Sequence, residues 1–197
     1  MKQVNFETGK YYHLFNRGNN KQSIFFDEEN YLYFLELVKK HLTPTVDILA
    51  YCLLKNHFHF VIQIKTNDLP DVYKSGKKKL HQPFSNLFNA YTKAINKKYE
   101  RSGSLFQEHL KRKEINTEEY LRQVIIYVHL NPASHRLTSN FENFPHSSYN
   151  SILSLKPTLL NRSEVVSLFE DVDNFKFNHR YKKINHDLLA EIIIEDT

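Results

Sequence analysis

The sequence predicts an α+β fold in which helices pack against an antiparallel β-sheet. Three observations lead to this prediction. Short runs rich in aliphatic and aromatic residues alternate with longer segments whose apolar residues recur at helical spacing. Two of the strand-like runs are separated by a very short connection, as in an antiparallel hairpin. Core-forming residues make up 41% of the 197 residues and charged residues 25%, which is ordinary for a globular domain.

The first three predicted elements are a strand, a helix and a second strand. Tyr11–Phe15 predicts a strand that ends in the turn-forming residues 16–20. Asp27 is suited to cap a helix that runs to about Lys40, because the apolar residues of this segment follow a helical period. The apolar segment Val46–Leu54 predicts the second strand.

A third strand, a second helix and a fourth strand follow. His57–Ile64 predicts a strand that pairs with the preceding one, and the polar, lysine-rich residues 66–82 predict a mobile loop. Pro83–Tyr99 has the apolar stripe of an amphipathic helix. The fourth strand is expected within Ser104–Ile115. Strand–helix–strand–strand–helix–strand with antiparallel neighbours is the ferredoxin-like motif.

A third helix and a C-terminal extension complete the predicted organisation. Thr117 is suited to cap a helix whose first turn is acidic, and Pro132 is expected to end this helix. We expect residues 1–152 to form the main domain. Residues 153–197 are expected to form a partly helical extension, with a short helix near Ser163–Phe169.

Positive charge is concentrated in the centre of the chain. The whole chain has 27 Lys and Arg against 22 Asp and Glu. Residues 65–113 hold 12 basic and 4 acidic side chains, a net charge of +8, so the rest of the chain carries −3. A positive centre predicts a surface for a polyanion such as nucleic acid, and a solvated lysine-rich face is the alternative.

No feature of the sequence predicts export or membrane insertion. The one cysteine, Cys52, cannot form an internal disulfide. Residues 1–10 lack the apolar run of a signal peptide, and no stretch approaches the roughly 18 apolar residues of a membrane span. We therefore expect a cytoplasmic protein without a membrane partner.

Two histidines share one face of the third predicted strand. Side chains alternate along a strand, so His57 and His59 project from one side, while Phe58 and Phe60 lie on the opposite, core side. Two imidazoles roughly 7 Å apart along a strand can converge on one cation. A pair of packed or solvent-facing histidines is the alternative interpretation.

A tyrosine and an asparagine lie one turn apart on the third predicted helix. Tyr127 and Asn131 are four residues apart, so their side chains lie one above the other. The phenol can supply a nucleophile, and the carboxamide can supply a third ligand to a site that the two histidines begin. Packing between core and water is the alternative for Tyr127.

These segments together resemble the HUH single-tyrosine transposases, and among them the REP-associated tyrosine transposases. The resemblance covers about residues 8–152 and rests on His57-Phe58-His59, followed about 70 residues later by Tyr127 and Asn131-Pro132. The supporting stretches are Tyr12 to Gly18, Ser102 to Gln107, Tyr127 to Pro132 and Pro145 to Tyr149. His146 replaces an aromatic residue, often Trp, that precedes the serine in such proteins, a departure that concerns packing more than chemistry.

The resemblance implies a DNA-nicking activity on the ferredoxin-like core of HUH endonucleases. It implies that His57 and His59 bind a divalent metal, Mg²⁺ or Mn²⁺, with Asn131 as a further ligand. Tyr127 would be the nucleophile that forms a 5′-phosphotyrosine link, and Tyr120, two turns earlier, is the competing candidate. The mixed N/O donor set suits Mn²⁺ and tolerates Mg²⁺, while the absence of a cysteine partner argues against structural zinc.

Single-stranded or hairpin DNA is the implied partner. The basic residues expected along its backbone are Arg17, Lys77, Lys78, Lys79, Lys97, Lys98, Lys111, Arg112 and Lys113, with Lys74 and Lys93 as further candidates. The resemblance allows a monomer or a homodimer that exchanges its tyrosine helices. A domesticated protein that binds DNA hairpins without cutting is the alternative function. A third is a hydrolase that uses water and does not need Tyr127.

Overall fold

A four-stranded antiparallel sheet forms the centre of the molecule. The structure is a computed structural model and describes residues 5–181, 184–190 and 192. The strands are β1 (Tyr11–Arg17), β2 (Val46–Leu54), β3 (His57–Ile64) and β4 (Lys111–Ile115), in the order β2-β3-β1-β4. This is the strand order of the ferredoxin-like motif, so the predicted α+β class is confirmed.

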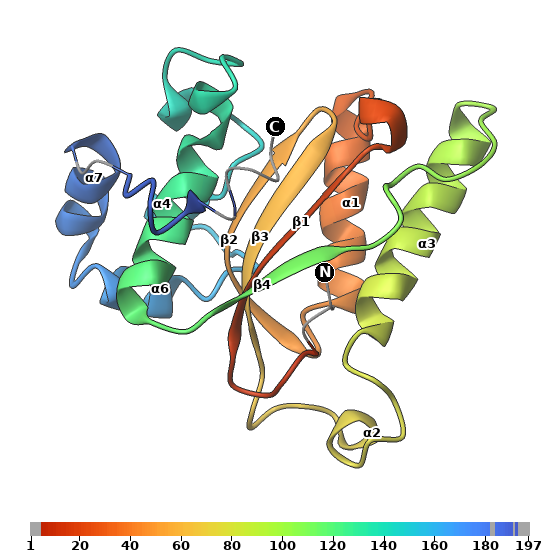
Figure 1. Cartoon of the computed structure of the whole chain (residues 1–197), viewed down its shortest axis with the longest axis horizontal. Helices are drawn as coiled ribbons and strands as arrows, with labels where there is room; N and C mark the ends of the chain where they lie inside the picture. Colours follow the sequence, from red (N-terminus) through yellow and green to blue (C-terminus); the bar gives the residue numbers. More distant parts are fainter. Residues whose placement is uncertain (1–4, 182–183, 191, 193–197) are drawn as a thin grey trace.

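Helices cover both faces of the sheet (Figure 1). Helices α1 (Glu28–His41) and α3 (Gln82–Lys98) pack against each other on one face, while α4 (Glu118–Ser134) crosses the other. A short helix, α2 (Asp71–Lys74), lies within the segment that the sequence predicts as a loop. Within the described residues, no helix combines the length and the apolarity that a bilayer crossing requires.

The predicted helix caps form as expected. The backbone N–H of Asn30 donates to Asp27 Oδ1 at 3.0 Å, and that of Tyr120 donates to Thr117 Oγ1 at 3.1 Å. Each bond satisfies a donor that the first turn of a helix leaves without an intrahelical acceptor. Lys98, in the last turn of α3, bridges Asp27 at 2.8 Å and also pairs with a carboxylate in the first turn of α1. These ion pairs connect the C-terminal end of α3 to the N-terminal end of α1.

The Phe58 and Phe60 side of β3 faces the core, as predicted, and the structure shows that α1 and α3 cover it. The Phe34 ring of α1 lies 5.5 Å from that of Phe58 and 6.3 Å from that of Phe60. The other side of β3, with His59 and Val61, is also buried, because α4 covers it. Complete burial of an apolar side chain such as Val61 or Phe58 stabilises the fold by roughly 1.5–3 kcal/mol.

Helix α4 continues past Pro132, where the sequence predicts its end. The helix runs to Ser134, and Pro132 is buried inside it. A proline so close to the end of a helix removes few hydrogen bonds, since only its own N–H is missing. The N–H of His135 still donates to the carbonyl of Asn131 at 3.0 Å.

The segment that includes His146 adds to the free edge of β2. Its backbone carbonyl accepts from the N–H of Leu53, and the N–H of Ser148 donates to the carbonyl of Tyr51, each at 2.9 Å. The His146 ring stacks on that of Tyr31 with centroids 3.6 Å apart and planes 2° from parallel. The position therefore makes a ring-packing contact with α1.

The C-terminal segment packs onto the same hydrophobic core as the sheet. Its helices are α5 (Tyr149–Leu153), α6 (Arg162–Leu168) and α7 (Val172–Tyr181). Elsewhere in the chain, one 3-10 turn, η1 (Asn19–Lys21), follows β1, and another, η2 (Phe141–Asn143), follows α4. Helix α6 confirms the predicted short helix. Phe169 and Phe175 belong to the same core cluster as the residues of β2 and β3. The division of the chain at residue 152 stays a prediction.

Candidate active site

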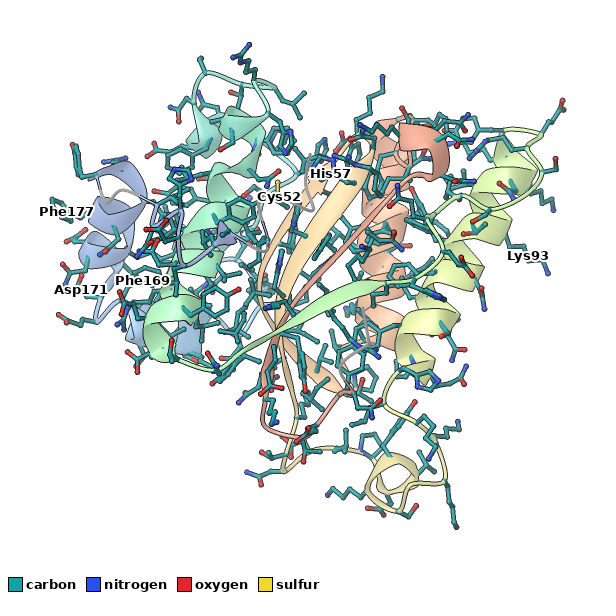
Figure 2. All side chains as sticks on the ribbon, in the orientation of Figure 1. Cys52, His57, Lys93, Phe169, Asp171 and Phe177 are labelled. Carbon is teal, nitrogen blue, oxygen red and sulfur yellow. The ribbon has the colours of Figure 1, made fainter. Side chains whose placement is uncertain are left out.

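The sheet face beneath α4 carries the predicted histidine pair. In the pairing of β1 with β3, His57 lies opposite Arg17 and His59 lies opposite Phe15. Residues directly opposite each other in an antiparallel pair point to the same face. His57 and His59 are only 5% and 0% exposed. Figure 2 shows His57 at the hairpin end of β2 and β3.

Tyr127 lies against this pair. Its ring centroid is 5.9 Å from that of His59 and 6.3 Å from that of His13, and both contacts are edge-on, at 85°. Tyr127 is itself only 5% exposed. Tyr120, the competing candidate, is buried two turns earlier on α4, where desolvation raises the pKa of its phenol. The structure thus brings the predicted tyrosine, and a histidine of the predicted pair, into contact.

Asn131 and His135 follow Tyr127 at intervals of one helical turn, on the same side of α4 and its C-terminal end. Asn131 is fully buried one turn beyond Tyr127. One turn further, the His135 ring lies 4.9 Å from the His57 ring. Asn131 therefore lies, along the helix, between a residue that contacts His59 and one that contacts His57.

Arg17 lies next to this site, at the end of β1. It is directly opposite His57 in the sheet. Burial lowers the pKa of His135, and the positive charge of Arg17 lowers it further. The next residue is Gly18. A Cβ at this position would lie 2.0 Å from the backbone carbonyl oxygen of Gln22, so a larger residue does not fit without movement of the backbone.

Hydrogen bonds hold the Nδ1 atoms of both predicted ligands. His57 Nδ1 lies 2.7 Å from Asn56 Oδ1, and His59 Nδ1 lies 3.0 Å from His13 Nε2. The sequence analysis missed His13 and His135 as members of this site. The first alternates with Phe15 on β1, and the second follows Asn131 by one helical turn, so both patterns were visible in the sequence.

The donor set fits a divalent cation with mixed N/O preference. Two imidazoles and an amide oxygen can hold Mn²⁺ or Mg²⁺ and leave positions for further oxygen ligands. In the described part of the chain, no cluster of three or more His, Cys, Asp or Glu side chains could hold a metal. Cys52, however, lies directly opposite His59 in the pairing of β2 with β3. Strand pairing thus brings Cys52 next to His59 in the sheet, although the two residues are distant in sequence, and the argument against structural zinc stays a prediction.

The basic residues of β4 divide between the two faces of the sheet. Lys111 lies opposite Phe15 in the pairing with β1, and Lys113 lies opposite His13, so both are on the face that holds the histidines. Arg112 points to the other face, where its guanidinium lies 4.4 Å from the centroid of the Phe6 ring. Only Lys111 and Lys113 of this group accompany the site.

The other predicted DNA contacts lie away from it. The exposed residues Lys77–Lys79 follow α2, which is at the opposite end of the molecule from His57 (Figures 1 and 2). Lys93 projects from the outer side of α3 (Figure 2). Lys97 is also exposed on α3, beside the ion-paired Lys98. Lys74 donates from Nζ to the carbonyl of Asn67 at 2.9 Å.

A cavity of about 750 Å³ also lies outside the site. It is bordered by Phe84 and Phe88 of α3, and by Arg112 on the face of the sheet opposite the histidine pair. The side chains of Tyr127, His57 and His59 do not line it.

A second group of buried histidines holds α4 in place. His179 Nδ1 donates to the carbonyl of Phe175 at 2.8 Å, so its Nε2 accepts from His129 Nδ1, also at 2.8 Å. His129 Nε2 then accepts from the hydroxyl of Ser148 at 2.7 Å, and that oxygen accepts from the N–H of Tyr51 at 2.8 Å. Each bond determines the proton position of the next. This chain joins α7, α4 and β2.

Comparison with known proteins finds the same fold. No family model matches the chain, and no curated protein matches it. Among solved structures it is similar to the REP-associated tyrosine transposase bound to a REP hairpin, with 17% sequence identity and a TM-score of 0.58. The similarity covers 80% of this chain and 87% of the other. The chain shares the α+β fold of that transposase.

Proposed function

We propose that this protein is a metal-dependent DNA transposase that nicks single-stranded or hairpin DNA and transfers the cut strand. The main support is the contact of Tyr127 with His59, at 5.9 Å between ring centroids. His57, on the same strand face as His59, and Asn131, one helical turn from Tyr127, are also buried. The fold is shared with a transposase that was solved with a DNA hairpin.

Tyr127 would act as the nucleophile. Its Oη attacks the phosphorus of a phosphodiester, the P–O3′ bond breaks, and the 3′-oxygen leaves as a hydroxyl after taking up a proton. The phenol loses its own proton to solvent, and a 5′-phosphotyrosine link remains. An ordinary tyrosine pKa is about 10, so activation near neutral pH requires a nearby positive charge.

His57, His59 and Asn131 would hold that charge as a bound divalent cation, Mg²⁺ or Mn²⁺. When bound, it supplies Lewis-acid stabilisation of the phosphate oxygens and favours the phenolate form of the tyrosine. The protein's part would be to keep these three buried donors near Tyr127, where few waters compete.

The covalent link makes the reaction reversible. The 3′-hydroxyl of another strand can attack the phosphotyrosine, which restores a phosphodiester and releases the phenol. No ATP is needed, because the link conserves the energy of the broken bond.

The DNA strand would approach along β4. Lys111 and Lys113 share the face of the histidine pair, and Arg17 lies opposite His57. Together they offer three positive charges to phosphates that flank the cut. Arg112 and the lysines of α3 and of the segment after α2 would at most contact more distant parts of a hairpin.

A single chain would suffice for the reaction. Tyr127 contacts His59 within the same protomer, so no exchange of α4 between subunits is needed to complete the site. A monomer and a homodimer that does not exchange α4 both fit this contact, and size-exclusion chromatography with light scattering distinguishes them.

The decisive experiment traps the covalent intermediate. Labelled hairpin DNA with a single-stranded flank is incubated with the protein and Mn²⁺, and the adduct is detected on a denaturing gel. We expect an adduct with the wild type and with Tyr120→Phe, and its loss with Tyr127→Phe or with EDTA. Hairpin binding by the wild type without cleavage would favour the domesticated DNA-binding protein. Cleavage that survives in Tyr127→Phe would favour a hydrolase that uses water.

A further inference from the structure

His13 is a buried polar residue that the proposed chemistry leaves without a role. It lies on β1, is 0% exposed, and places its Nε2 3.0 Å from His59 Nδ1. The two rings are 3° from parallel, with centroids 5.1 Å apart. Phe15 stacks on both rings, at 5.1 Å from His13 and 5.9 Å from His59. The His13 ring is therefore held in a defined orientation toward His59.

The proton in this hydrogen bond determines which nitrogen of His59 can bind a metal. A neutral imidazole has one N–H and one lone pair. If His59 Nδ1 donates to His13, then the lone pair of His59 is on Nε2. If His13 donates instead, the proton of His59 is on Nε2, and that nitrogen cannot be a ligand.

The neighbouring histidine shows the ligand-competent arrangement. Asn56 Oδ1 can only accept, so His57 Nδ1 carries the proton in the 2.7 Å bond between them. The lone pair of His57 is therefore on Nε2. A metal that both histidines bind through the same ring atom requires His59 to have the same tautomer.

We propose that His13 is a positioning residue that accepts a hydrogen bond from His59 Nδ1 and thereby presents His59 Nε2 as a metal ligand. His13 is then neutral, with its own proton on Nδ1. Such partners fix the tautomer and orientation of ligating histidines and raise their basicity. His13 also contacts the ring of Tyr127, at 6.3 Å, so it borders the nucleophile as well. This inference rests on the proposed function, since it assumes the metal site.

The first test needs no metal. Long-range ¹H–¹⁵N NMR spectra of the imidazoles report which nitrogen of each histidine carries the proton. We expect His59 in the wild type to carry it on Nδ1, and His59 in His13→Leu to shift toward the Nε2–H form. A wild-type His59 with its proton on Nε2 overturns the proposal, even if the protein binds metal and cleaves DNA.

The second test measures Mn²⁺ affinity without DNA, by electron paramagnetic resonance of the free ion. His13→Leu, which cannot accept a hydrogen bond, should bind Mn²⁺ about 10–100-fold more weakly than the wild type. His13→Gln places an amide oxygen at the same distance along the side chain and should restore affinity to within about threefold. Urea unfolding of each variant shows whether it is folded. If His13→Leu does not fold, the NMR spectrum of the wild type and the Mn²⁺ affinity of His13→Gln decide.

The outcomes separate this inference from the proposed function. Wild-type levels of Mn²⁺ affinity in both variants, with adduct formation intact, overturn the role of His13 alone. Absence of both Mn²⁺ binding and adduct formation in the wild type overturns the proposed function and this inference with it.

Discussion

The two groups of buried histidines differ in what surrounds each ring nitrogen. In the group on α4 and α7, each nitrogen of His129 and His179 has a protein partner, so both rings are neutral and already satisfied. In the group under Tyr127, the Nδ1 atoms of His57 and His59 are bonded within the protein. The hydrogen bonds of the first group join α7, α4 and β2, whereas the Nε2 atoms of His57 and His59 would bind the cation in the proposed metal site.

The first group makes the stability of the fold depend on pH. Burial lowers the pKa of His179 to about 4 and that of His129 well below its usual range. The unfolded chain, with histidine pKa near 6.5, therefore binds more protons than the fold between about pH 6.5 and 4. Stability is complete above this window and is lost as the pH falls through it.

We expect urea unfolding to show this loss. From pH 7.5 to pH 5, the free energy of unfolding should fall by about 2 kcal/mol from His179 alone. Lowered carboxyl pKa values such as that of Asp27, about 2, act only at lower pH. His179→Gln should make the dependence between pH 7.5 and 5 shallower. Equal unfolding free energies of the wild type at the two pH values would contradict the assignment of two neutral buried rings.

Helix α4 carries one side of the candidate site and is held by separate contacts at its two ends. Its N-terminus is capped by Thr117, far from Tyr127 along the helix. Its C-terminal half carries Tyr127 and Asn131, which face the candidate site, and His129, which is hydrogen-bonded to His179 of α7. Capping therefore contributes to the stability of α4, while its position over the sheet depends on the buried contacts near its other end.

Thr117→Ala tests this division within the helix. Loss of the cap should lower the free energy of unfolding by about 1 kcal/mol. Adduct formation at temperatures below the transition should stay near the wild-type rate, because the contacts of Tyr127 are more than two turns away. Thr117→Ser, which keeps the hydroxyl, serves as the matched control. A large loss of adduct in folded Thr117→Ala would show that the cap positions the tyrosine.

The whole molecule has two sides with different properties. The α4 side holds the buried histidines and Tyr127, with Lys111 and Lys113 on the adjoining edge strand. The α1–α3 side holds Lys93, Lys97 and Lys98 of α3 and a cavity with aromatic walls. The central positive charge is therefore not one continuous surface next to the site.

DNA affinity should reflect this separation. Lys111→Ala combined with Lys113→Ala should weaken binding to single-stranded DNA and reduce the slope of log K against log salt by about 0.7 for each lysine. Lys93→Ala, on the outer side of α3, is the matched control and should leave both quantities near wild type. Fluorescence anisotropy at about 50 to 300 mM salt, a range that includes physiological ionic strength, measures the affinity and its salt dependence. An equal effect of Lys93→Ala would place the strand on the α3 side instead.

Local patterns were sufficient to predict the elements and part of the site. The strand and helix periods, the two N-caps and the alternation of His57 with Phe58 depend on near neighbours in the chain, so the sequence displays them directly. Helix α7 and the continuation of α4 past Pro132 were not predicted, because both depend on contacts with the core that no local window contains.

By itself, the sequence determined which residues share a face of each strand or helix, and hence that Tyr127 accompanies Asn131 and that His57 accompanies His59. Only the tertiary structure decided which faces meet. Strand register places Cys52 and Phe15 beside His59, sends Arg112 away from Lys111 and Lys113, and brings His13 within hydrogen-bonding distance of His59. The reason is physical: the period of one element defines its own faces, whereas pairing and packing between elements depend on the free energy of the whole core.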